Sequence, residues 1–75
     1  MILYSTARCG YCRKARAYFK AHGIAFTDYD VETSTEGQRD YRRMGARGVP
    51  VILVGDKRMV GFSESAFASL YANNQ

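Results

Sequence analysis

The sequence is poor in metal ligands and in long apolar runs. It has 75 residues, with two cysteines, one histidine, one proline and no tryptophan. A structural zinc site needs four ligands, and the cysteines with His22 supply three, which argues against a self-contained zinc site. No apolar run approaches the ~20 residues that cross a bilayer, so we expect no membrane span. Met1 leads straight into apolar residues without a basic start or cleavage site, so we expect no signal peptide and a cytoplasmic location.

Basic residues are in excess, but they do not form a nucleic-acid motif. The net charge is +4, and basic residues never occur more than two in a row. The excess indicates an anionic partner. Without a recognisable motif, we expect no nucleic acid to be bound. Five of the cations surround or follow the cysteines: Arg8, Arg13, Lys14, Arg16 and Lys20.

The two cysteines, Cys9 and Cys12, are separated by two residues. A short apolar run that predicts a strand precedes them, and a helical pattern follows them. Structural disulfides are rare in the cytoplasm, so the pair is expected to be catalytic or metal-binding. Between a strand and a helix, this spacing predicts a redox motif.

The patterning of the whole chain predicts one small α/β domain, residues 1–75. The expected elements are a strand at 1–5, a helix at 10–22, a strand at 24–31, a helix at 33–44, strands at 49–54 and 57–60, and a helix after Ser63. We expect the first two connections to be right-handed crossovers between parallel strands. The Gly55-Asp56 turn should add an antiparallel edge strand. Helices would then cover both faces of the sheet.

The ends and buried faces of the first two helices can also be predicted. An apolar stripe marks the buried face of the first helix, at Cys12, Ala15, Phe19 and His22. Gly23 is placed to cap the end of that helix. Thr33 and Glu36 form a capping box for the second helix, which Gly45 ends.

For the last part of the chain, Pro50 is expected at the entrance of the third strand, because proline inside a central strand would remove a ladder hydrogen bond. Ser63 is expected to cap the third helix, with Phe62 and Phe67 spaced as a hydrophobic staple. The sheet-facing residues of this helix are expected to be Ala66 and Leu70, with Phe67 or Tyr71.

Three segments carry a family resemblance: Cys9-Gly10-Tyr11-Cys12, Gly48-Val49-Pro50 and Gly61-Phe62-Ser63-Glu64. In this order and spacing, the whole chain resembles the glutaredoxin family. The resemblance implies the minimal thioredoxin fold, β-α-β-α-β-β-α, with a four-stranded mixed sheet. It also implies a thiol–disulfide oxidoreductase that reduces protein disulfides, glutathione mixed disulfides, or both.

The position of the cysteines suggests how they would divide the reaction. At the start of a helix, unpaired N–H groups and the helix dipole favour the thiolate of Cys9. Cys9 would attack as the nucleophile, and Cys12, more buried and protonated, would resolve the mixed disulfide.

The resemblance also implies a binding groove and its partners. A cis peptide bond would precede Pro50. Glutathione would be a co-substrate of a monomer without a tightly bound cofactor, and disulfide-containing proteins would be the substrates. The implied substrate- or glutathione-binding residues are Tyr11, Arg47, Val49, Pro50, Gly61, Phe62, Ser63 and Glu64.

Three departures from the family pattern leave the electron donor open. Thr6 stands where glutaredoxins often carry a lysine, and Gly10-Tyr11 replaces their usual Pro-Tyr. Gly61-Phe62 resembles the glutaredoxin-like redoxins that thioredoxin reductase recharges and that serve ribonucleotide reductase. That role is one alternative. Another is an iron–sulfur carrier, with a [2Fe-2S] cluster bridging two chains through Cys9 and a thiol cofactor from each.

Overall fold

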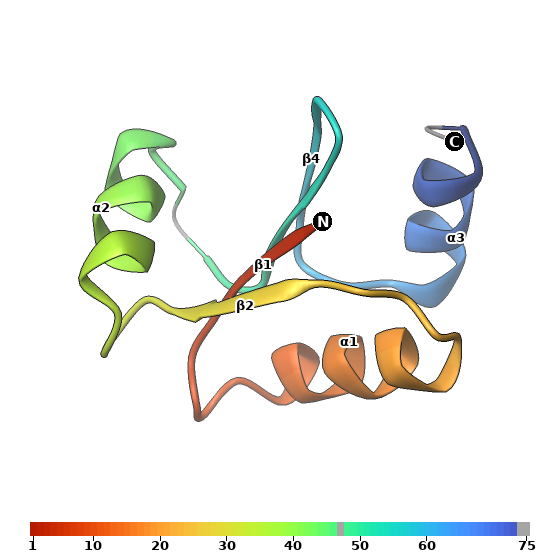
Figure 1. The fold of residues 1–75 in the computed structure, drawn as a ribbon, viewed down its shortest axis with the longest axis horizontal. Helices are drawn as coiled ribbons and strands as arrows, with labels where there is room; N and C mark the ends of the chain where they lie inside the picture. Colours follow the sequence, from red (N-terminus) through yellow and green to blue (C-terminus); the bar gives the residue numbers. More distant parts are fainter. Residues whose placement is uncertain (47, 74–75) are drawn as a thin grey trace.

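The computed structural model describes residues 1–46 and 48–73, and their elements follow the order β-α-β-α-β-β-α. This order is the predicted one, and helices lie on both faces of a mixed sheet (Figure 1). None of the helices in these residues is long and apolar enough to cross a membrane. The elements are β1 (Ile2–Ser5), α1 (Gly10–Ala21), β2 (Thr27–Asp30), α2 (Thr35–Arg43), β3 (Val51–Val54), β4 (Lys57–Val60) and α3 (Glu64–Asn73).

The sheet has the strand order β2-β1-β3-β4, so β1 and β3 are its central strands. Strands β1 and β2 are parallel, whereas β3 is antiparallel to β1 and β4 is antiparallel to β3. The prediction of a second parallel crossover was therefore wrong. Patterning predicts a helix between two strands, but not the end of the sheet at which the chain re-enters. Here the chain re-enters at the carboxyl end of β1, where Val51 pairs with Tyr4 and the Val49 carbonyl lies beside the Cys9 sulfur.

Helix α1 has the predicted buried stripe over most of its length. Cys12, Ala15 and Phe19 are fully buried, but His22 is exposed, and its ring stacks on Tyr18 with centroids 4.1 Å apart. His22 leaves the stripe because the helix ends at Ala21.

A Schellman motif closes α1 after His22. The N–H groups of Gly23 and Ile24 donate to the carbonyls of Lys20 and Phe19, at 3.3 and 2.8 Å. Gly23 takes φ of 65°, which a residue with a Cβ rarely adopts. The predicted glycine cap is confirmed.

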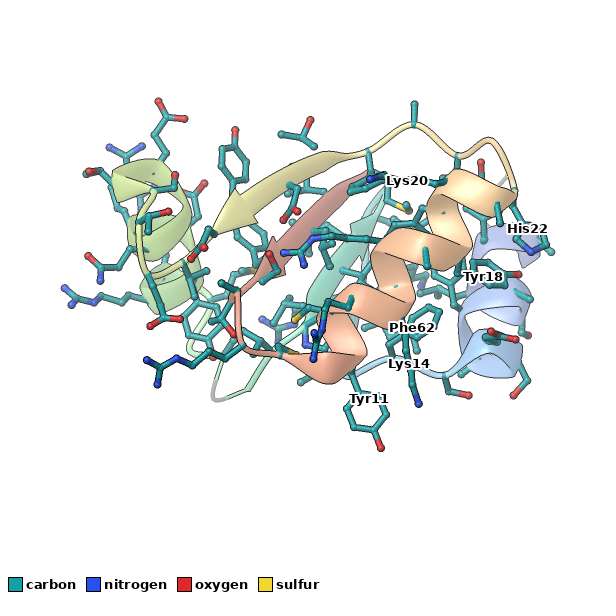
Figure 2. The ribbon with its side chains drawn as sticks, turned by 90° about the horizontal axis from the view of Figure 1, so that it is seen from below. Tyr11, Lys14, Tyr18, Lys20, His22 and Phe62 are labelled. Carbon is teal, nitrogen blue, oxygen red and sulfur yellow. The ribbon has the colours of Figure 1, made fainter. Side chains whose placement is uncertain are left out.

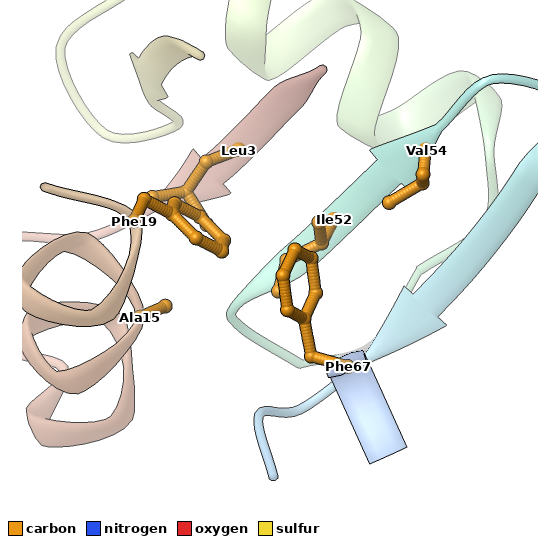
Figure 3. Packing of buried hydrophobic residues seen from close by; sticks show 6 residues of the cluster. All are labelled: Leu3, Ala15, Phe19, Ile52, Val54 and Phe67. Carbon is orange, nitrogen blue, oxygen red and sulfur yellow. The ribbon is translucent and has the colours of Figure 1, made fainter. Parts of the chain in front are cut away.

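Two hydrophobic clusters hold the layers together. The first packs α1 and α3 against one face of the sheet (Figure 3), through Leu3, Ala15, Phe19, Ile52, Val54 and Phe67. The second packs α2 against the other face, around Tyr4, Val31 and Val51 with the half-buried Tyr41 and Met44. Successive residues of β1 and of β3 thus face opposite clusters, as the alternation of a strand requires.

Several boundaries differ from the predictions, most clearly those of the second strand and the start of the second helix. The second strand covers only Thr27–Asp30 instead of residues 24–31. Ile24 and Phe26 lie in the loop before it, where they pack against the first hydrophobic cluster without pairing in the sheet. The capping box of Thr33 was wrong by one residue. Ser34 is the N-cap of α2, and its hydroxyl accepts the N–H of Gly37 at 3.1 Å.

The beginning of α3 is as predicted. The hydroxyl of Ser63 accepts the N–H of Ala66 at 3.5 Å, and the Phe62 and Phe67 rings form the staple, with centroids 6.2 Å apart. The prediction that Ala66 faces the sheet was wrong, because it is exposed. The buried face centres on Phe67, with Leu70 and Tyr71 packed beside it.

Candidate active site

The sulfur of Cys9 is the N-terminal cap of α1. It accepts the N–H of Cys12 at 3.1 Å, in the place that a serine hydroxyl usually takes. The sulfur also lies 3.7 Å from the carbonyl oxygen of Val49, to which the thiol form donates. Cys9 is half-buried, so it is the more accessible of the two cysteines.

Cys12 lies one turn further along α1, on its buried face. Burial, together with the neighbouring Cys9, raises the pKa of the Cys12 thiol to about 12. A backbone hydrogen bond with Thr6 and the charge of Arg16 act in the opposite direction. Both cysteines are free thiols, and Cys12 keeps its proton at neutral pH.

The loop before β3 lies against Cys9. The peptide bond between Val49 and Pro50 is cis, as the resemblance implied, and Pro50 is fully buried. The Pro50 carbonyl accepts the N–H of Gly61 at 2.7 Å, and Gly61 takes φ of 85°. These contacts bring Cys9, the Val49-Pro50 bond and the segment that enters α3 to one end of the molecule.

The other predicted binding residues have differing surroundings. Tyr11 is 59% exposed at the start of α1, with Lys14 Nζ 5.3 Å from its ring centroid (Figure 2). The Phe62 ring instead lies between α1 and α3, half-buried against the first hydrophobic cluster and in edge contact with Tyr18 at 5.8 Å. The predicted contact residue Arg47 lies outside the described residues.

The remaining two predicted residues, Ser63 and Glu64, are exposed at the start of α3. Glu64 also lines a surface hollow of about 480 Å³ with Lys14 and Tyr18 of α1. This hollow lies between α1 and the start of α3.

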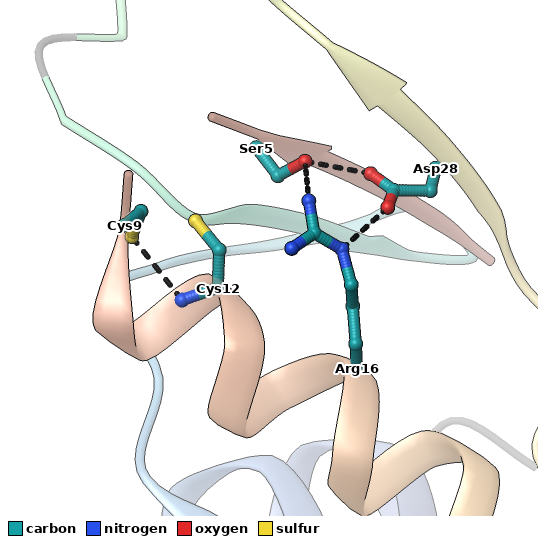
Figure 4. A network of polar contacts seen from close by, with 5 residues as sticks. All are labelled: Ser5, Cys9, Cys12, Arg16 and Asp28. Carbon is teal, nitrogen blue, oxygen red and sulfur yellow. Dashed lines mark hydrogen bonds and ion pairs between the residues drawn. The ribbon is translucent and has the colours of Figure 1, made fainter. Parts of the chain in front are cut away.

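A polar network beside Cys12 was not found by sequence reasoning (Figure 4). Arg16 Nε lies 2.6 Å from Asp28 Oδ2, and its Nη2 donates to Ser5 Oγ at 2.6 Å. The Ser5 hydroxyl in turn donates to Asp28 Oδ1 at 2.7 Å. The available signal was Arg16 four residues after Cys12, on the same side of the helix, with an acid in the second strand.

The described residues include no group of three or more histidine, cysteine, aspartate or glutamate side chains that could hold a metal ion. What the site offers is an accessible capping sulfur next to a buried thiol that can reach it. That arrangement suits an exchange of disulfides, in which the first sulfur attacks and the second resolves.

Comparison with known proteins gives consistent matches over most of the chain. A glutaredoxin family model matches residues 1–59. A glutaredoxin-like 8.6 kDa protein from the rubredoxin operon of Clostridium pasteurianum is 32% identical over 69 residues, 91% of this chain and 92% of that protein. The glutaredoxin-like protein NrdH of Lactococcus lactis subsp. cremoris is 31% identical over 68 residues, 91% of this chain and 94% of NrdH.

A solved structure is also similar to this chain over most of its length. The NrdH-redoxin of Escherichia coli superimposes with a TM-score of 0.80 at 25% identity, covering 92% of this chain and 91% of the redoxin. Its structure is described as the basis of a thioredoxin-like activity profile in a glutaredoxin-like protein.

Proposed function

The chain belongs to the glutaredoxin family of thiol–disulfide oxidoreductases, and we propose that Cys9 and Cys12 are the dithiol that carries its reaction. The observation that carries this proposal is the unequal environment of the two sulfurs. Cys9 is accessible and accepts a helix N–H, whereas Cys12 is buried with a raised pKa. Cys9 is therefore suited to attack the substrate disulfide, and Cys12 to resolve the mixed disulfide that forms.

The reaction then has two steps. The Cys9 thiolate attacks a substrate disulfide, forms a mixed disulfide and releases one substrate thiolate, which takes up a proton. Cys12 next loses its proton and attacks the Cys9 sulfur. This forms the Cys9–Cys12 disulfide and releases the second substrate thiol, so that the substrate gains two electrons and the protein loses them.

The substrate would be held on the side of Cys9 where the Val49-Pro50 loop lies. The Val49 carbonyl is next to the attacking sulfur, so an extended chain that pairs with the Val49 backbone would bring its own sulfur to Cys9. Tyr11 would bound this groove on the solvent side. The start of α3, at Ser63 and Glu64, would hold a carboxylate of the substrate through its free N–H groups.

Thioredoxin reductase is the electron donor that we favour for this chain. Thr6 replaces the lysine that helps glutaredoxins hold glutathione, and Gly61-Phe62 is the pattern of NrdH-type redoxins. Similarity to two proteins named NrdH supports this assignment. Glutathione is the second candidate donor, because the family uses it. Ribonucleotide reductase is the substrate implied by the NrdH pattern, in the cytoplasm, where thiols are kept reduced.

Two coupled assays test the function and the donor together. NADPH consumption is followed with insulin as the disulfide substrate, recharged either by thioredoxin reductase or by glutathione with glutathione reductase. We expect turnover with thioredoxin reductase, and none in the Cys9→Ser variant. Cys12→Ser should accumulate a Cys9 mixed disulfide that mass spectrometry detects.

The outcomes separate the two parts of the proposal. Turnover only with glutathione would refute the assignment of the donor, while leaving the dithiol reaction in place. Activity that persists in the Cys9→Ser variant would refute the function itself. So would a lack of activity of the wild-type protein in both assays.

A further inference from the structure

The polar network of Ser5, Arg16 and Asp28 lies on the same face of the sheet as the buried side of α1. Ser5, at the carboxyl end of β1, is fully buried, and it is the polar member of the buried set in the described residues. Its hydroxyl donates to Asp28 Oδ1 and accepts from Arg16 Nη2. Both carboxylate oxygens of Asp28 are in use, because Oδ2 accepts from Arg16 Nε. Two contacts of 2.6 Å hold the guanidinium of Arg16, and a third of 2.7 Å joins Ser5 to Asp28.

This network places a fixed positive charge near the resolving sulfur. Residues four apart on a helix are neighbours on its surface, so Arg16 follows Cys12 on the side of α1 that faces the sheet. Figure 4 shows the Cys12 sulfur and the Arg16 guanidinium projecting to that side. The Arg16 and Asp28 side chains are 24% and 32% exposed, so water screens them only in part.

The groups that act on Cys12 can be named element by element. At the start of its own helix, Cys9 raises the pKa of Cys12. A backbone hydrogen bond with Thr6, in the loop before the helix, lowers it, and the charge of Arg16 on the helix lowers it to a smaller extent. From β2, Asp28 binds Arg16 and has the opposite charge. From β1 comes the uncharged Ser5, and β3 is entirely apolar.

We propose that Arg16, oriented by Asp28 and Ser5, is a positioning residue for the resolving step: its charge favours the Cys12 thiolate at the moment when Cys12 must attack. This inference rests on the proposed dithiol reaction and adds a group that favours its second step. In the mixed disulfide, Cys9 is bonded to the substrate and no longer opposes the ionisation of Cys12. Burial is then the main barrier to ionisation of Cys12, and the charge of Arg16 offsets part of it, beside the backbone hydrogen bond with Thr6.

The bonds and charges of this step balance within the proposed reaction. The Cys12 proton leaves to water, and the Cys12 thiolate forms a bond to the Cys9 sulfur. The bond from Cys9 to the substrate sulfur breaks, and the departing thiolate takes a proton from water. Arg16 remains bound to Asp28 and Ser5 throughout, so no further reactant is needed.

A purely structural role for the network makes a different prediction from an electrostatic one. If the network only ties α1 to the sheet, removing either Arg16 or Asp28 should affect Cys12 in the same way. If the charge of Arg16 matters, the two changes should have opposite effects. Arg16→Met removes the positive charge, whereas Asp28→Asn keeps an acceptor of nearly the same shape and removes the opposing negative charge.

The experiment follows the reaction of the reduced protein with Ellman's reagent by stopped flow between pH 6 and about 10. The first release of thionitrobenzoate reports the attack by Cys9, and the second reports resolution by Cys12. We expect Arg16→Met to raise the pKa of Cys12 and so slow the second phase at each pH, and Asp28→Asn to lower that pKa and speed the second phase. For a shift of one unit, the rate at neutral pH should change about threefold, because a more basic thiolate is scarcer but more nucleophilic.

Lys57→Met is the matched control, because it removes a positive charge from an exposed position of β4, at the opposite edge of the sheet from Asp28. Its second phase should match that of the wild type. Shifts of Arg16→Met and Asp28→Asn in the same direction, or no shift in either, would overturn the inference. If Arg16→Met does not fold, the direction of the Asp28→Asn shift decides alone.

The same traces keep the two proposals apart. A missing first phase would mean that Cys9 is not the attacking residue, and the proposed function would fail. A normal first phase, with a second phase that ignores the charge of Arg16, would leave the function in place and refute only this inference.

Discussion

Replacing Gly37 with alanine tests how closely α2 packs against the sheet. Gly37 is buried in the first turn of α2, and a Cβ built there would lie 2.7 Å from the Cβ of Tyr29 in β2. Two carbon atoms cannot come so close, and a Cβ cannot rotate away as the end of a long side chain can. The alanine variant must therefore move α2 away from β2.

The size of the effect follows from two opposing terms. Alanine in place of glycine in a helix contributes up to about 1 kcal/mol of stability. Overpacking at a rigid contact costs about 1–3 kcal/mol. The shift would also disturb the stacked Tyr4 and Tyr29 rings, whose centroids are 5.7 Å apart. We expect a net loss of about 1 kcal/mol in the free energy of unfolding, or a Tm lower by about 4–8 °C.

Urea unfolding of the reduced protein measures the loss, with Gly10→Ala as the control. A Cβ at Gly10 meets nothing within 4 Å, so that variant should be as stable as the wild type or slightly more stable. A Gly37→Ala protein that is at least as stable as the wild type would show that the contact with Tyr29 is not tight, and would refute the reasoning.

Two further predictions concern Cys12 and the start of α2. Because burial raises the pKa of Cys12 to about 12 in the folded protein, against about 8.5 in an unfolded chain, the unfolded chain loses this proton first. The stability of the reduced protein is therefore unaffected by this group below about pH 8.5, and falls by up to ~1.4 kcal/mol per pH unit as the pH rises toward 12. Urea titrations of wild type and Cys12→Ser should diverge over that range, and parallel curves would contradict the assignment. Because Ser34 caps α2, Ser34→Ala should lower the free energy of unfolding by about 1 kcal/mol, and Thr33→Ala should change it little. A larger loss for Thr33→Ala in thermal unfolding would show instead that Thr33 is the N-cap.

The parts of the fold that could be predicted are those that short stretches of sequence determine. The cap at Gly23 and the staple of Phe62 and Phe67 depend on residues a few positions apart. So does the placement of Cys9 at the start of α1, because a strand, a turn and a helical pattern fix it locally.

What could not be predicted depends on where distant segments meet. The direction of β3 is set by the pairing of Val51 with Tyr4, which no local pattern encodes. The network of Ser5, Arg16 and Asp28 needs β1, β2 and α1 to be placed together before any of its contacts exists. The loop residues Ile24 and Phe26 have the alternating apolar pattern of a strand because they pack, half-buried, against the first hydrophobic cluster, although the strand pairing begins only at Thr27.

The capping sulfur of Cys9 links the electrochemistry of the protein to the integrity of α1. A thiol or thiolate accepts the Cys12 N–H well, whereas a sulfur within a disulfide is a weaker acceptor. An N-cap acceptor contributes about 1 kcal/mol, so part of this stabilisation belongs to the reduced form alone. Stabilising the reduced form makes a dithiol a milder reductant, by about 20 mV for each kcal/mol in a two-electron couple. Folding of α1 therefore moderates the reducing strength of the same two cysteines, compared with their strength in the unfolded chain.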